Sequence, residues 1–79
     1  RVIQLARNDH RFTAGGAKYV SSLHLLAAPQ STDKGRLYQA AALMSDASGR
    51  LVYRFFNITM GKLVPIVTTI DVVKEVNLA

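Results

Sequence analysis

Ser22 and His24 are the residues whose types and spacing first suggest chemistry. On an extended segment they would share a face, and a serine beside a histidine acts as a nucleophile when an acid orients the imidazole. Asp9 or Asp33 would have to supply that acid. Hydrolysis also needs hydrogen-bond reach between serine and base, and donors for an oxyanion, which two residues on one strand do not provide. We therefore expect a half-buried histidine, ordinary serines and no catalytic residues.

The sequence also offers few residues that could bind a metal ion. The chain has two histidines, His10 and His24, and no Cys, and only Asp9 adjoins one of these histidines. Zinc sites require repeated ligand spacing, such as two histidines one helical turn apart. The five acidic residues are scattered, as expected for surface and capping groups. The sequence predicts no metal site, no cofactor, no small-molecule substrate and no enzymatic activity.

A basic and aromatic cluster is the strongest functional signal. Sheets that expose aromatic rings beside arginines bind single-stranded nucleic acid by stacking and phosphate contacts. The candidate nucleic-acid-binding residues are Arg36, Arg50, Tyr53, Arg54 and Lys62. Strand alternation would turn Tyr53 and Phe55 to one face of the sheet and Arg54 to the other. One of these faces must be the core, so only part of the cluster can be exposed.

Three apolar segments of eight residues each would position these side chains. The segments are Leu37–Met44, Leu51–Ile58 and Leu63–Ile70, and short glycine-bearing connections join them. This pattern predicts antiparallel strands. A turn ending at Gly49 would place Ala42 opposite Tyr53 or Val52. Pro65 cannot donate a hydrogen bond to a neighbouring strand, so the third strand should lie at an edge or contain a bulge.

Four other segments complete the prediction. Val2–Ala6 suits a short opening strand and Pro29–Gly35 a loop. Tyr19–Ala28 has alternative strand and helix interpretations, and the glycines that precede it favour a strand. Asp71–Leu78 also has both interpretations. Asp71 is a suitable helix N-cap and the valines that follow could pack on one side, so we expect a short helix there.

These elements predict a single small α+β domain over residues 1–79: an antiparallel meander sheet of four to five strands with a short C-terminal helix. A small all-β barrel is the alternative fold. Residues 1–17 form a basic N-terminal segment that we expect to be partly flexible, since it ends near two adjacent glycines. One short helix covers little of a sheet, so apolar surface should remain for a partner.

The amino-acid composition indicates which classes of partner to expect. Ten Lys and Arg against five Asp and Glu give a net charge of +5, which favours an anionic partner. No apolar stretch approaches the roughly 18 residues that span a bilayer, and no signal-peptide pattern is present. With no Cys, we expect a cytoplasmic protein. We expect a non-enzymatic binding or assembly module that forms a homo-oligomer or docks on a protein partner through its sheet; the alternative is an accessory nucleic-acid-binding protein.

Overall fold

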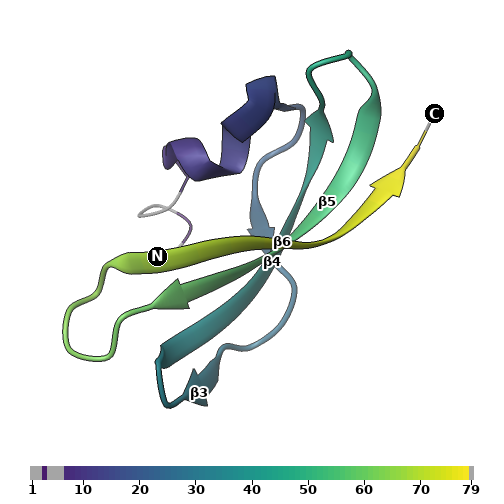
Figure 1. Ribbon diagram of the computed structural model, residues 1–79. Helices are drawn as coiled ribbons and strands as arrows, with labels where there is room; N and C mark the ends of the chain where they lie inside the picture. Colours follow the sequence, from purple (N-terminus) through teal and green to yellow (C-terminus); the bar gives the residue numbers. More distant parts are fainter. Residues whose placement is uncertain (1–2, 4–6, 79) are drawn as a thin grey trace.

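The computed structural model describes residue 3 and residues 7–78, which form one antiparallel sheet and a short helix (Figure 1). The elements are the 3-10 helix η1 (His10–Gly16) and the strands β1 (Lys18–Tyr19), β2 (His24–Leu25), β3 (Gln30–Thr32), β4 (Gly35–Ser45), β5 (Leu51–Met60) and β6 (Val67–Asn77). The strand order is β1-β4-β5-β6, and β2 and β3 also pair with β4. The predicted antiparallel sheet is confirmed. In the part of the chain described, it has six strands rather than the predicted four to five, because the N-terminal half supplies three short strands. The sheet is open, so the barrel alternative is wrong.

Strands β4 and β5 form the centre of the sheet. Their turn is held by Asp46, whose Oδ1 accepts from the backbone amides of Ser48 and Arg50, each at 2.9 Å. Small residues of β4 face large residues of β5, as in the pair Ala40 and Phe56. The predicted register is wrong, because Ala42 lies opposite Arg54 rather than Tyr53 or Val52. The turn contains five residues between the last paired positions, so the pairing is shifted along β5.

The predicted C-terminal helix is wrong. Residues 71–77 of the segment Asp71–Leu78 belong to strand β6, with Asp71 opposite Asn57 of β5. The valines of this segment are β-branched and lose side-chain freedom in a helix, whereas they suit a strand. The predicted strand Leu63–Ile70 is confirmed only from Val67 onward, because β6 begins two residues after Pro65 and the proline lies in the preceding connection. The strand lies at an edge of the sheet, one of the two predicted outcomes. Among residues 7–78 the helical element is η1 instead, with Asp9 as its N-cap.

The N-terminal half supplies short pieces of strand. Within Tyr19–Ala28, the strand interpretation is confirmed only in part, since β1 ends at Tyr19 and β2 contains two residues. The predicted loop Pro29–Gly35 contains β3, which pairs with the start of β4. The predicted opening strand Val2–Ala6 lies, apart from Ile3, outside the described residues. These short strands all pair with β4, so they divide one edge of the sheet among them.

The hydrophobic core lies on one face of the sheet, beneath η1 (Figure 1). This covered face carries Ala40, Ala42, Met44, Val52, Phe56, Ile58 and Met60. Phe12 of η1 is fully buried against it, and its ring meets that of Phe56 edge to face at a centroid distance of 4.8 Å. The opposite face, which we call the open face, carries Leu37, Gln39, Leu43, Tyr53, Phe55, Asn57, Lys74 and Val76.

Candidate interaction surfaces

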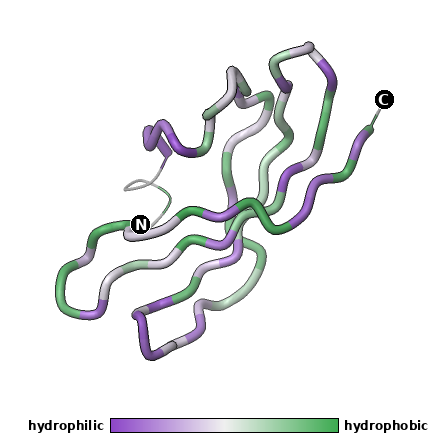
Figure 2. The backbone as a smooth tube through the Cα atoms, viewed as in Figure 1, coloured by the Kyte–Doolittle hydropathy of each residue, from purple (hydrophilic) through white to green (hydrophobic). Residues whose placement is uncertain are grey.

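Strand β6 is an exposed edge strand of 11 residues. It pairs with β5 on one side, and no other described strand pairs with it. Its side chains are exposed apart from Val67 and Ile70, which are half-buried. Val72 and Val73 in its middle are 53% and 55% exposed, and Figure 2 shows this hydrophobic stretch crossing the middle of the molecule. The edge therefore combines accessible backbone with apolar side chains.

A bulge lies in the middle of this edge. Lys74 pairs with Phe55 and Val72 with Phe56, so Val73 is an extra residue without an opposite partner on β5. A bulge changes the alternation of side chains along a strand. Asp71 and Lys74 both come to the open face as a result, although they are three residues apart.

Arg11 covers the beginning of the β6 edge. Its Nη1 donates to the carbonyl of Thr68 at 3.0 Å and its Nη2 to that of Val67 at 3.2 Å. Asp9 holds the guanidinium in place, accepting from Nη2 at 2.7 Å and from Nε at 3.0 Å. The hydrogen bond from Arg11 lowers the pKa of Asp9 to about 2. In the described part of the chain, this arginine is the only side chain that bonds to the outer backbone of residues 67–76.

Aromatic side chains gather on the open face. The rings of Tyr53 and Phe55 meet edge to face at a centroid distance of 5.2 Å. Lys74 Nζ lies 5.8 Å from the centre of the Phe55 ring, within cation–π range. Tyr53 Oη lies 2.9 Å from Nε2 of His24 on β2. These contacts give the open face a small aromatic surface with one amino group beside it.

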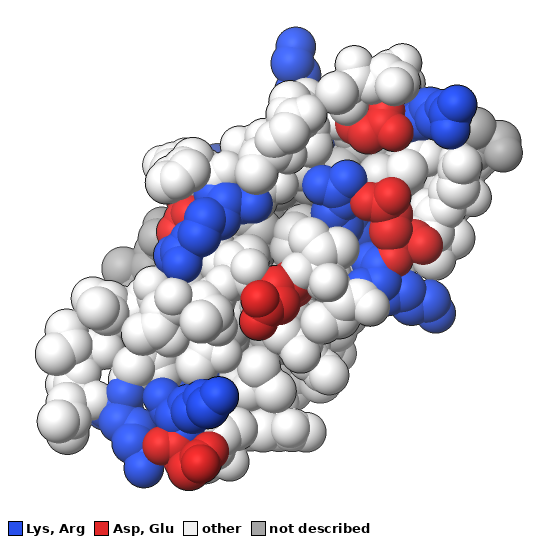
Figure 3. All heavy atoms as spheres, viewed as in Figure 1, with Lys and Arg blue, Asp and Glu red and all other residues white. Residues whose placement is uncertain are grey.

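The predicted nucleic-acid residues do not converge on that surface. Arg54 points to the covered face, where its Nε donates to Glu75 at 2.6 Å and its side chain is only 15% exposed. Arg50 lies in the turn after β4, at the opposite end of the hairpin from Arg36. Figure 3 shows Lys and Arg in separate groups, some of them beside acidic residues. The predicted separation of Tyr53 from Arg54 by strand alternation is confirmed.

Arg36 and Lys62 are the two predicted residues that the fold brings together. Both line a cavity of about 340 Å³ at one end of the sheet, with the hydroxyl-bearing residues Ser31 and Thr32. The connection that follows Lys62 is apolar and exposed, with Leu63 97% exposed at its start. The Thr32 hydroxyl already donates to the Gly35 carbonyl at 2.8 Å, so the two cations and the Ser31 hydroxyl are the groups suited to an anion.

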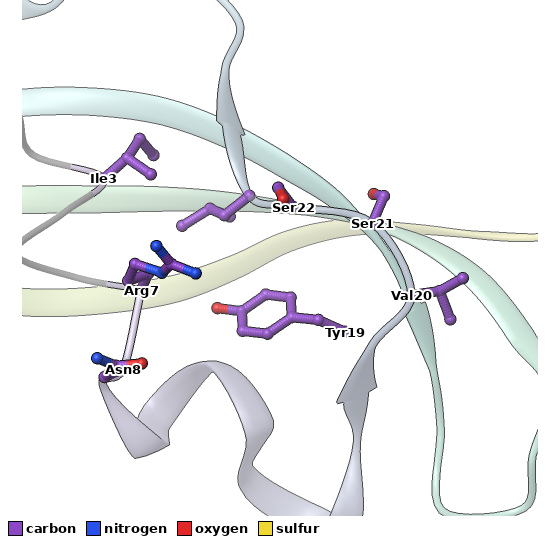
Figure 4. A pocket seen from close by; sticks show the side chains of 8 residues that line it. Ile3, Arg7, Asn8, Tyr19, Val20, Ser21 and Ser22 are labelled. Atoms are coloured by element: carbon purple, nitrogen blue, oxygen red, sulfur yellow. The ribbon is translucent and has the colours of Figure 1, made fainter.

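A second cavity, of about 350 Å³, lies between β1 and the segment before η1 (Figure 4). Tyr19 and Arg7 point toward each other across it, and Asn8 and Ser22 also line it. The Tyr19 hydroxyl is buried and has no hydrogen-bond partner among the described residues, and burial raises its pKa to about 12. The phenol is therefore neutral at physiological pH and can bind a water molecule or a small polar group. Sequence reasoning did not identify this cavity, because the position of Tyr19 depends on the two-residue strand β1.

The serine–histidine pair is not arranged as a nucleophile and base. The prediction of a half-buried histidine is also wrong, because His24 lies on the short strand β2 and is exposed. His24 Nδ1 lies 3.4 Å from the backbone carbonyl of Ser22, and Nε2 faces Tyr53. Among the residues described, no group of three His, Cys, Asp or Glu side chains is placed to hold a metal ion. Within the same residues, no helix has the length and apolar character to cross a membrane.

Comparison with protein-family models, curated proteins and solved structures finds no match to this chain.

The residues of the β6 edge are the ones that sequence reasoning missed. Asp71, Val72, Val73 and Lys74 were expected on a helix, where they would not form a continuous edge. The adjacent valines were the available signal, since β-branched residues favour strands over helices.

Proposed function

We propose that this protein is a small non-enzymatic assembly module that self-associates through the β6 edge of its sheet. The observation that carries the proposal is an 11-residue edge strand with apolar side chains exposed along it. An edge strand presents amide and carbonyl groups that another strand can pair with, and burial of the valines adds to the gain.

The size of the domain supports the same proposal. A single core in a chain this short contributes only about 3–5 kcal/mol, and association is a common way to bury more apolar surface. Proteins usually shield an edge with charged residues, Pro or a covering segment. Among the described residues, the covering side chain is Arg11 at Val67 and Thr68. The rest of β6, apart from the half-buried Ile70, is exposed, with Asp71, Lys74 and Glu75 as its charged residues.

Size-exclusion chromatography with light scattering tests the proposal on the full chain at low micromolar concentration. We expect a dimer or larger species without any added partner. Val72→Lys should shift it to a monomer, because a lysine in the middle of the edge opposes strand pairing. Val20→Lys is the matched control, since Val20 is also 53% exposed but lies outside β6. A monomeric natural chain, or equal effects of the two substitutions, would contradict the proposal.

A second candidate function is accessory binding of nucleic acid. It is favoured by Arg36 and Lys62, which line one cavity. Fluorescence anisotropy with a labelled single-stranded oligonucleotide tests it: affinity should fall steeply between about 50 and about 200 mM salt. Arg36→Ala should weaken binding and reduce the salt dependence, and Arg50→Ala, at the other end of the hairpin, is the control. An oligonucleotide affinity that does not change with salt concentration would exclude this function.

A further inference from the structure

We propose that the strand that pairs with β6 is β6 of a second copy, antiparallel to it, with the two-fold axis between Val72 and Val73. This inference rests on the self-association proposed above and adds the partner strand and its register. Most soluble oligomers are homo-oligomers with such a two-fold axis, and the axis makes each contact occur twice. The argument for this register comes from the bulge and from the charges on either side of it.

The bulge places opposite charges on one face of the edge. Asp71 lies opposite Asn57, and Lys74 lies opposite Phe55. Asn57 and Phe55 are two apart on β5 and therefore share the open face. Asp71 and Lys74 share it too, whereas in a regular strand residues three apart would point to opposite faces.

A two-fold axis between Val72 and Val73 then brings these charges together. Asp71 of each copy lies opposite Lys74 of the other, which gives two cross-strand pairs of opposite charge on the same face. Val72 lies opposite Val73 of the second copy, next to the axis. Neither Asp71 nor Lys74 belongs to the ion pairs formed among the described residues, which are Arg11 with Asp9 and Arg54 with Glu75.

Competing registers fit less well. Pairing Lys74 with Glu75 of the second copy would match charges by sequence, but Glu75 lies opposite Arg54 and points to the covered face. The two groups would then lie on opposite sides of the sheet. Pairing across Val67 and Thr68 would displace Arg11 from the carbonyls that it occupies. The proposed register spans residues 69–76 and leaves that contact intact.

Charge exchange tests the register on the full chain. Asp71→Lys and Lys74→Asp each place like charges opposite each other at two positions of the proposed dimer. We expect each variant alone to dissociate at least about tenfold more readily than the natural chain, since two cross-strand pairs change from attraction to repulsion. A 1:1 mixture of the two variants should recover association, because the mixed dimer restores both opposite-charge pairs. Native mass spectrometry distinguishes the mixed dimer by its mass.

The double variant Asp71→Lys with Lys74→Asp is the folding control, because it exchanges both charges and should dimerise like the natural chain. The possible outcomes distinguish failure of the proposed register from failure of the proposed function. If both single variants dimerise as tightly as the natural chain, the register is wrong and self-association stands. If they are monomeric and the mixture stays monomeric, these residues are not opposite each other and the register is wrong. A monomeric natural chain would overturn both the register and the proposed function.

Discussion

Strands β5 and β6 have similar lengths and both contain several apolar residues, yet their side chains have different surroundings. In β5 four residues, Val52, Phe56, Ile58 and Met60, are buried. In β6, of almost equal length, none is buried. β5 has β4 on one side and β6 on the other, whereas β5 is the single neighbour of β6 among the strands described. Residue types can therefore specify a strand without specifying its burial, which depends on how many strands and layers surround it.

The two edges of the sheet differ in the same way. On the β4 side the edge is divided among β1, β2 and β3, each two or three residues long and separated by connections. Short edge strands give an incoming strand little continuous backbone to pair with. On the other side β6 runs for 11 residues. This contrast identifies β6, rather than the β4 side, as the edge suited to association.

The largest effect should come from truncating the core of β5. Phe56 is 1% exposed and packs on Phe12, so Phe56→Ala should lower the free energy of unfolding by about 3–5 kcal/mol. Val73→Ala on β6 should cost less than about 1 kcal/mol. Both are measured by urea unfolding in the Lys74→Asp background, in which we expect the protein to be monomeric. Equal losses would contradict the difference between the two strands.

Gly35 offers a test of how tightly β4 is held against the end of β5. Its φ is +138°, and a Cβ there would lie 1.9 Å from the carbonyl oxygen of Met60. Gly35→Ala should therefore cost about 2–3 kcal/mol through backbone strain and overpacking. Gly49→Ala is the matched control, because its φ is +83° and nothing lies within 4 Å of the added Cβ. We expect a cost of about 1 kcal/mol there, from urea unfolding.

If the two alanine variants lose equal stability, the contact between Gly35 and Met60 does not matter to the fold. The pairing of β4 with β5 near Met60 would then depend on side-chain packing alone. The close backbone approach at Gly35 would not distinguish β5 from β6.

The sequence was sufficient to predict the central strands, because Leu51–Ile58 is rich in β-branched and aromatic residues and a Gly-bearing turn precedes it. For the third apolar segment it predicted an edge position or a bulge, and the edge position is what β6 has, although the strand begins only after Pro65. It did not predict the strand at Asp71–Leu78, because an N-cap residue before apolar residues also fits a helix. Whether this segment forms a helix or a strand depends on whether β5 has an unpaired side for it to join, and that is a property of the tertiary structure.

The same tertiary dependence limits prediction of the sites. Strand alternation was enough to separate Tyr53 from Arg54. The pairing of Arg54 with Glu75 could not be predicted, because Glu75 faces Arg54 only when the C-terminal segment is a strand in this register. The bulge at Val73, which brings Asp71 and Lys74 to one face, has no signature in the sequence.

The smallest effect concerns Asp9, which holds the arginine that covers the start of β6. The hydrogen bond from Arg11 lowers the pKa of Asp9 from 3.8 to about 2 in the folded protein. A lowered folded-state pKa contributes stability that is present above the unfolded pKa, near pH 4, and is lost as the pH falls through about 2. Urea unfolding across this interval should therefore show a modest loss of stability attributable to Asp9.

Asp9→Asn isolates this contribution, since the amide oxygen can still accept the N-cap hydrogen bond but does not titrate. The variant should lose less stability than the natural chain between pH 4 and pH 2, and amide hydrogen exchange near Val67 and Thr68 should change less with pH. Identical pH dependence in the two proteins would show that the Asp9–Arg11 pair does not stabilise the start of β6. The stability of strand β6 would then come from its pairing with β5 alone. The difference between β5, which packs on several elements, and β6 would be larger.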